Sequence, residues 1–345
     1  MKGNFSNILV GTLALLLILY LGKALWMPLA LSGLCALSIY PATRYLEQKG
    51  WKRSLAILPP LLILLILFIA FLILFAWLIN DIVHRVIELW PLIQQSLDQL
   101  SLQIEASLNI SVRQQIDFLT QQINKAKDNA GSMLAFSLMQ TASAIVYLVL
   151  IPVLVYLMLY HRRKIMQFLI SQIPEAYQQV LPSALQKAVY TFYRYLQGIF
   201  LVYLLVGILN SAGLAILNIP NAIGFGMLAA LLTAIPFVGI ILGSIPPLIL
   251  ALTLHNSIWY PLGVIGIFTL VQYLEANLIF PLAVGNRLQM NALAVIIVML
   301  GGALIWGMAG LILFLPALAI FRVVAEEIPT LKPWADLIGD KPDAL

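Results

Sequence analysis

The feature that most constrains this chain is a long stretch without formal charge that still contains many helix-breaking residues. Between Arg194 and Glu275 the sequence has no Asp, Glu, Lys or Arg. Within this stretch, Thr233 to Pro247 reads TAIPFVGIILGSIPP and contains three prolines and two glycines. Charge-free apolar stretches are typical of helices inside a membrane, whereas Pro and Gly interrupt helices. We therefore expect membrane-embedded helices that are broken part of the way across.

The composition supports a membrane protein over the whole chain. Of 345 residues, 62% are hydrophobic and 10% are charged, whereas globular domains have about 25% charged residues. The apolar segments are long and do not alternate with polar residues, which favours helices over a β-barrel. We predict an all-α polytopic membrane protein with about six full transmembrane helices plus two Pro/Gly-broken re-entrant helical hairpins, about eight hydrophobic segments in total.

Basic residues predict the orientation of the spans. Full spans are expected near residues 8–22, 24–40, 55–79, 134–160 and 195–217. Lys and Arg cluster between Arg44 and Arg53 and between Arg162 and Lys164. Short loops rich in Lys and Arg mark the cytoplasmic side. Both clusters agree with this rule if both termini are cytoplasmic and residues 80–132 are external. Because the Lys and Arg residues act mainly as determinants of topology, the net charge of +5 gives no reason to expect nucleic-acid binding.

The external segment 80–132 is expected to be an amphipathic helical arm. Its six acidic and four basic residues argue against a polybasic lipid-binding helix. It could pack on its own protein, lie at the membrane interface, contact the same arm of a neighbouring subunit, or handle substrate directly. Apolar residues recur at spacings of three and four at Ile82, Val86, Leu89, Ile93, Leu97, Leu100 and Ile104.

Two segments have the length and composition of broken hairpins. Asn221 to Leu254 splits at Pro236–Gly239 into arms of about 15 residues, or about 22 Å, which is too short to cross comfortably. The same pattern recurs from Asn291 to Val324, with a break near Gly307. An offset of 70 residues aligns the two segments at five positions, a weak match in so apolar a composition, so an internal repeat stays an open alternative.

Several residues could break these helices or line the gap between their arms. Gly239 and Gly243 also form a GxxxG step, for which close helix packing is the alternative interpretation. The predicted hairpin and helix breaks are Gly243, Pro246, Pro281, Gly285, Gly307, Gly310 and Pro316.

Glu275 is the strongest candidate for a functional residue. From Tyr195 to Phe321 only Glu275 and Arg287 carry a formal charge. A carboxylate inside a membrane is costly unless it is paired, hydrated or protonated, so it marks a candidate site by default. The alternative is an ion pair with Arg287 that serves packing alone. The candidate substrate- or ion-binding residues are Gln272, Glu275, Asn277, Asn210, Pro236, Phe237 and Gly239.

Other functional classes lack their motifs in this sequence. The only Gly-Lys pair, Gly22-Lys23, is followed by Ala24 and not by Ser or Thr, so there is no P-loop. His84, His161 and His255 are scattered and Cys35 is the only cysteine, so no metal site is expected. No hydrolase nucleophile motif occurs. We therefore predict no cofactor and no enzymatic activity.

The domain division follows from these segments. The charge-free second half with its broken hairpins is expected to carry transport, and the first three spans to form a scaffold. The predicted domains are the N-terminal three-span scaffold 1–79, the external arm 80–132, the fourth span and cytoplasmic helical linker 133–194, the transport half 195–325 and the cytoplasmic tail 326–345.

Several strings in the sequence resemble the autoinducer-2 exporter (AI-2E) family of bacterial membrane proteins. The first is AIPFVGIILGSIPP, and the second is EANLIFPLAVGNR, which begins at Glu275. The third is the Gly-x-x-Gly step from Gly307 to Gly310, followed by Pro316. The resemblance implies a secondary transporter of the bacterial inner membrane that exports a small polar metabolite or signalling molecule similar to autoinducer-2. It also implies a homo-oligomer, with a pentamer as one candidate. Two alternatives stay open: an antiporter that exchanges sodium or another cation for protons, and a non-transporting membrane scaffold.

Overall fold

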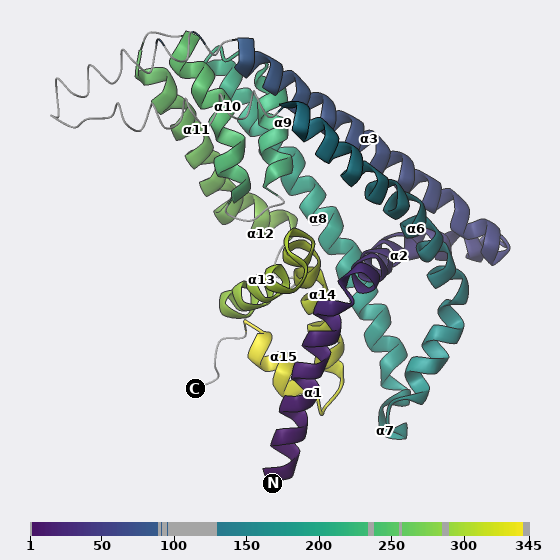
Figure 1. The fold of residues 1–345 in the computed structure, drawn as a ribbon. Helices are drawn as coiled ribbons and strands as arrows, with labels where there is room; N and C mark the ends of the chain where they lie inside the picture. The colour runs from purple at the N-terminus through teal and green to yellow at the C-terminus, as the bar shows by residue number, and fades with distance from the viewer. Residues whose placement is uncertain are drawn as a thin grey trace. The chain divides into compact units, whose positions relative to one another are not determined.

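A computed structural model of the chain describes residues 2–88, 91, 95, 130–233, 238–254, 257–284 and 290–340. Helices take up nearly all of these residues, and the only β-type contact among them is an isolated bridge between Met290 and Gly339. The all-α prediction is confirmed. The helices are α1 (Lys2–Leu21), α2 (Lys23–Gln48), α3 (Arg53–Glu88), α6 (Ala130–Ser171), α7 (Glu175–Gln178), α8 (Val180–Ile216), α9 (Ala222–Leu232), α10 (Val238–Leu254), α11 (Trp259–Leu274), the π-helix η1 (Glu275–Ile279), α12 (Phe280–Ala283), α13 (Ala292–Trp306), α14 (Met308–Glu327) and α15 (Lys332–Ile338) (Figure 1).

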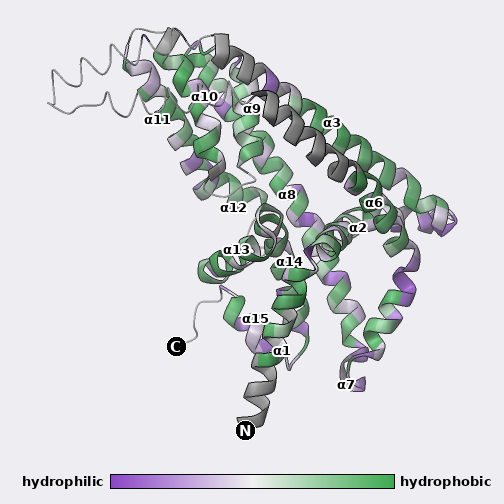
Figure 2. Cartoon of the chain, viewed as in Figure 1, coloured by the Kyte–Doolittle hydropathy of each residue, from purple (hydrophilic) through white to green (hydrophobic). Residues whose placement is uncertain are grey.

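Six of the described helices are long and apolar enough to cross a membrane, as expected for a polytopic protein. Figure 2 shows hydrophobic residues along most of α9, α10 and α13, and hydrophilic residues near α7. Helix α1 corresponds to the first expected span, and α14, expected as a hairpin arm, is one of the six. The six segments are Lys23–Gln48, Arg53–Trp77, Val146–Ser171, Val180–Ile216, Trp259–Ala283 and Met308–Glu327.

The predicted external arm, 80–132, lies mostly outside the described residues. Helix α3 continues through Glu88 into its first part, and α6 begins at Ala130. At 36 residues, α3 is about 54 Å long, well over the thickness of the hydrocarbon core. The arm therefore begins as a continuation of the third span.

The chain divides into two compact units. The first contains Met1–Phe68, Tyr147–Ile199 and Val284–Leu345, and the second contains Ile69–Val146 and Phe200–Ala283. The first hairpin and Glu275 belong to the second unit, and the second hairpin belongs to the first unit.

In the first unit, polar contacts join the two basic clusters. Arg162 forms an ion pair with Glu47, and an Arg53 guanidinium nitrogen donates a 3.2 Å hydrogen bond to the Tyr160 carbonyl oxygen. Beneath them, α2, α3 and α6 share a core of buried residues that includes Ile57 and Val155. The loop after α2 and the end of the apolar part of α6 therefore lie on the same side of this bundle, as the charge pattern requires.

In the second unit, α8 to α11 pack around one apolar core. Its fully buried members include Leu214, Phe225, Ala251 and Val264, one from each helix. Because a single core receives side chains from both arms of the first hairpin, that hairpin is held by its neighbours as well as by its own packing.

Both predicted hairpins are broken where expected. Helix α9 ends at Leu232 and α10 begins at Val238, while α13 ends at Trp306 and α14 begins at Met308. Between the latter pair, Gly307 has φ 62° and ψ −141°, a backbone conformation that is essentially restricted to glycine. The first arm of each hairpin begins after an asparagine, Asn221 or Asn291, at the positions that the offset of 70 aligns.

Four of the predicted breaks are wrong. Helix α10 continues through Gly243 and Pro246, and α14 continues through Gly310 and Pro316. A proline costs a helix one hydrogen bond, and neighbouring helices and local adjustment make up for this loss in membrane proteins. The two glycines serve close packing, since a methyl group added at Gly243 would lie 2.6 Å from the Cα atom of Ala229.

Candidate functional site

Glu275 lies at a change of helix type in the second unit. Helix α11 ends at Leu274, and the π-helix η1 runs from Glu275 to Ile279. The side chain is buried, with 8% exposed, and its Oε2 atom has no hydrogen-bond partner among the described residues. A buried carboxyl oxygen without a partner is costly, so this position calls for a proton, a cation, water or a polar solute.

The π-helix is explained by the proline that follows it. The Phe280 amide donates to the Glu275 carbonyl, five residues back instead of four. Pro281 has no amide hydrogen, and its ring would collide with the carbonyl of Asn277 in a regular helix. One widened turn relieves this collision, and such turns occur often at functional sites. The sequence therefore places the distortion next to Glu275.

Helix α8 packs antiparallel to α11 in a defined register. A methyl group added at Gly213 would lie 2.5 Å from the Cγ2 atom of Ile267. One added at Gly263 would lie 3.0 Å from the Cδ1 atom of Leu217. The two contacts are four residues apart on each helix and run in opposite directions, so both follow the same register.

Helix α8 also packs antiparallel to α9, the first arm of the hairpin. A methyl group added at Gly207 would lie 3.4 Å from the Cβ atom of Ala230, and one added at Gly226 would lie 2.7 Å from the Cα atom of Ser211. These contacts again run in opposite directions along the two helices. The glycines allow the backbones of α8 and α9 to approach closely, as small residues do between membrane helices.

Extending both registers along α8 leads us to expect the end of the first hairpin arm and the carboxylate near one level, with Leu232 and Glu275 each close to the level of Leu205. Tyr203, about half a turn away, is half-buried and interacts electrostatically with Glu275. The candidate site therefore consists of Glu275, Tyr203 and the end of α9, all within the second unit.

Gly239 stands where the second hairpin arm starts. It lies in α10, is buried, and an added methyl group would collide with the Leu232 carbonyl oxygen. Gly239 has no unusual backbone conformation, because the positive-φ glycines among the described residues are Gly50 and Gly307. Glycine is needed at position 239 because no larger side chain fits beside Leu232, and not because the backbone adopts a conformation reserved for glycine.

The remaining predicted polar residues differ in burial and in their distance from Glu275. Gln272 is half-buried one turn before Glu275, whereas Asn277 is exposed and donates a 2.9 Å hydrogen bond to the Tyr273 carbonyl. Asn210 is 2% exposed and its Oδ1 atom has no partner among the described residues. Asn210 lies five residues from Leu205, or about 7.5 Å along α8, so it forms a separate polar position. Pro236, Phe237, Gly285 and Arg287 lie outside the described residues.

Tyr203 is the member of the site that the sequence analysis missed. In an apolar stretch a tyrosine is more often a core or interface residue. The available signal was its spacing, because Tyr203 and Asn210 are seven residues apart and share one face of α8. The spacing points to a site only when the packing of α8 against α11 shows which residues lie opposite this face.

The second hairpin has a comparable construction in the first unit. A methyl group added at Gly302 would lie 2.6 Å from the Gly310 carbonyl oxygen, and one added at Gly310 would collide with the Gly302 carbonyl oxygen. The arms α13 and α14 therefore touch backbone to backbone. Asn291 caps α13, since its Oδ1 atom accepts a 2.7 Å hydrogen bond from the Ala294 amide.

Paired interrupted helices together with a buried carboxylate define a class, that of helical membrane transporters. A sequence profile of the AI-2E family transporters matches residues 9–330. The chain belongs to the AI-2E family, and it is a multi-pass membrane protein with a role in membrane transport.

Relatives agree with this assignment. A Mycobacterium tuberculosis protein that is provisionally named as a transport protein is 25% identical over 347 residues, covering 99% of this chain and 93% of the relative. A similarly named Synechocystis protein is 26% identical and covers 85% of this chain and 75% of its own length. The AI-2 transport protein TqsA of Escherichia coli is 26% identical over 177 residues, covering 50% of this chain and 51% of TqsA.

Proposed function

We propose that the protein is a secondary transporter that exports a small polar metabolite or signalling molecule across the bacterial inner membrane. The observation that supports this function is the buried carboxyl oxygen of Glu275, which has no hydrogen-bond partner among the described residues. A solute that reaches this oxygen can replace the missing partner. The relative TqsA is named an AI-2 transport protein, which makes a solute similar to AI-2 the first candidate.

The same carboxyl group supports a second candidate function, exchange of sodium or another cation for protons. Glu275 can hold either a proton or a cation, but not both at once, and this exclusion is the basis of antiport. Tyr203 is the nearest candidate on α8 for a further oxygen ligand, since the Glu275 charge acts on it. We expect either function to operate within a homo-oligomer, for which a pentamer is one candidate.

The experiment is transport by the full chain in proteoliposomes with imposed proton and sodium gradients. AI-2 uptake into inverted vesicles tests export, and a pH-sensitive dye inside the vesicles tests antiport. We expect Glu275→Gln to reduce solute flux or cation-dependent proton flux at least tenfold while expression and oligomeric state persist. Glu175→Gln, at an exposed site on α7, is the matched control.

Three results would decide the matter. Solute flux that Glu275→Gln abolishes supports the exporter. Proton flux that depends on sodium, without solute flux, supports the antiporter. If neither flux occurs, or if Glu275→Gln transports normally at every pH, Glu275 serves packing and the scaffold alternative gains ground.

We further propose that both termini are cytoplasmic and that 80–132 is external. The support is the polar contact of Glu47 and Arg53 with the end of the apolar part of α6 in the first unit. In a Cys35→Ser background, an impermeant thiol reagent added outside should label Gln103→Cys and leave Lys49→Cys unlabelled. Labelling of Lys49→Cys alone would invert the topology.

A further inference from the structure

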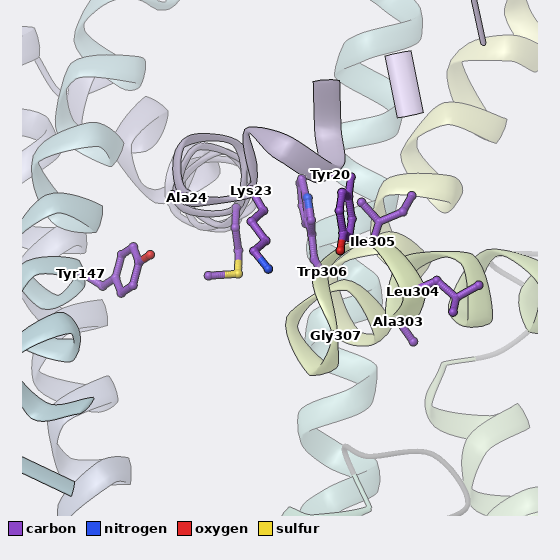
Figure 3. A pocket seen from close by; sticks show the side chains of 10 residues that line it. Tyr20, Lys23, Ala24, Tyr147, Ala303, Leu304, Ile305, Trp306 and Gly307 are labelled. Atoms are coloured by element: carbon purple, nitrogen blue, oxygen red, sulfur yellow. The ribbon is translucent and has the colours of Figure 1, made fainter. Parts of the chain in front are cut away.

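The first unit contains a cavity that the proposed transport site does not use. Its volume is about 490 Å³, and it is lined by the junction of α1 and α2, by α6, and by the last turn of α13 (Figure 3). Cavities of about 300–1,000 Å³ are the size that small-molecule sites have. Glu275 belongs to the second unit, so this cavity is a separate feature.

The walls of the cavity are held by specific contacts. The Trp306 indole N–H donates a 3.0 Å hydrogen bond to the Leu19 carbonyl, and its ring packs edge-on against Phe314 with centroids 5.2 Å apart. Directly after Trp306, the glycine conformation of Gly307 ends α13. The indole ring therefore forms a fixed wall, and its N–H group is already engaged.

Lys23 gives the cavity its chemical character. It is the only formally charged residue of the lining, and its side chain extends into the cavity toward Tyr20 and Trp306 (Figure 3). The ammonium lies 5.7 Å from the centroid of the Tyr20 ring, and no described carboxylate lies within ion-pair distance. Lys23 is exposed, and an ammonium without a counter-ion is available to pair with an anionic group.

We propose that this cavity binds an organic anion, a phosphate or carboxylate group attached to an apolar body. The Lys23 ammonium pairs with the anionic group, and the Tyr147 hydroxyl, across the cavity, is available as a hydrogen-bond donor. Met27 and the Trp306 ring are available to contact the apolar body. The ligand is either a phospholipid of the membrane or a free amphiphilic anion, which share this chemistry.

Binding to the full-length protein in an uncharged detergent tests the proposal. The probes are octyl phosphate as the free anion, phosphatidylglycerol as the lipid, and octanol as the uncharged match. Native mass spectrometry counts bound lipid, and equilibrium dialysis measures octyl phosphate and octanol. We expect Lys23→Gln to weaken binding of the anionic probes about tenfold or more, and Lys23→Arg to retain most of it.

Two further variants separate a specific site from general attraction. Lys52→Gln removes an exposed lysine of the cytoplasmic loop and should leave binding unchanged. Ala303→Phe fills the cavity while Lys23 remains and should weaken binding as strongly as Lys23→Gln. Saturable binding of octyl phosphate that phosphatidylglycerol does not displace identifies a solute site, and displacement identifies a lipid site.

The proposal is overturned if wild type and Lys23→Gln bind both anionic probes equally, or if octanol binds as well as octyl phosphate. Binding that Ala303→Phe leaves intact would also overturn it, because the anion would then lie outside the cavity. None of these results bears on Glu275, so failure here and failure of the transport proposal are distinguishable.

Discussion

Two adjacent glycines of α13 provide a matched test of how the second hairpin is held together. An added methyl group at Gly301 would meet nothing within 4 Å, whereas one at Gly302 would lie 2.6 Å from the Gly310 carbonyl oxygen and 2.8 Å from the Cγ atom of Phe314. Gly301→Ala and Gly302→Ala thus make the same chemical change one residue apart. Only the second forces α13 away from α14.

The magnitudes follow from two terms. Replacing glycine by alanine inside a helix stabilises it by about 1 kcal/mol, and this term is common to both variants. Overpacking costs about 1–3 kcal/mol. The first atom struck at Gly302 belongs to the opposite backbone and cannot rotate aside, so the upper part of that range applies. We expect Gly301→Ala to stabilise by about 1 kcal/mol and Gly302→Ala to destabilise by about 1–2 kcal/mol.

The measurement is the apparent Tm of the purified full-length protein in a mild detergent, together with an unfolding titration in SDS that gives the free-energy difference. The separation between the two variants, about 2–3 kcal/mol, isolates the packing term because the helix-propensity term cancels. Equal stability of Gly302→Ala and Gly301→Ala would show that α13 and α14 do not touch backbone to backbone, and would refute the reasoning.

Two other changes in this hairpin have distinct outcomes. Asn291→Ala removes the cap of α13 and the 2.6 Å hydrogen bond from the Asn291 side-chain nitrogen to the Leu337 carbonyl, so it should destabilise by about 1–2 kcal/mol. Asn291→Asp keeps the oxygen that caps α13 and should recover part of this loss in the same unfolding titration. If it recovers none, the loss of stability comes entirely from the hydrogen bond that the Asn291 side-chain nitrogen donates to Leu337. Gly307→Ala has open space around the new methyl group but forces alanine into a glycine conformation, so it should cost about 1–3 kcal/mol. A Tm unchanged by Gly307→Ala would mean that the backbone at this position relaxes freely.

The positions of the hairpin breaks were predictable because they depend on local chemistry. Arms too short for the bilayer, with Pro or Gly between them, have few alternatives to a turn. The same local reasoning failed at Gly243, Pro246, Gly310 and Pro316. Whether a glycine ends a helix or lets another helix approach depends on what lies opposite, and Gly243 has Ala229 opposite it.

The candidate site was only half predictable for a similar reason. A carboxylate in a charge-free stretch is conspicuous in any sequence, so Glu275 could be found without a structure. The relation of Glu275 to Tyr203 and Leu232 depends on two helix registers, which are set by the glycines at positions 207, 213, 226 and 263. Those glycines are scattered through the sequence, and their partners cannot be paired without the tertiary fold.

The short arms of the first hairpin have a consequence for how the chain is inserted into the membrane during synthesis. Helix α9 has 11 residues and is about 16 Å long, roughly half of the hydrocarbon thickness. The last four carbonyls of a helix have no partner within it, and lipid offers them none. Because α11, which completes the apolar core around α9, is synthesised after both arms, the hairpin cannot reach its final packing until α11 has entered the bilayer. A nascent chain stopped before Trp259 should therefore insert α8 stably but leave the hairpin arms accessible to thiol reagents and proteases.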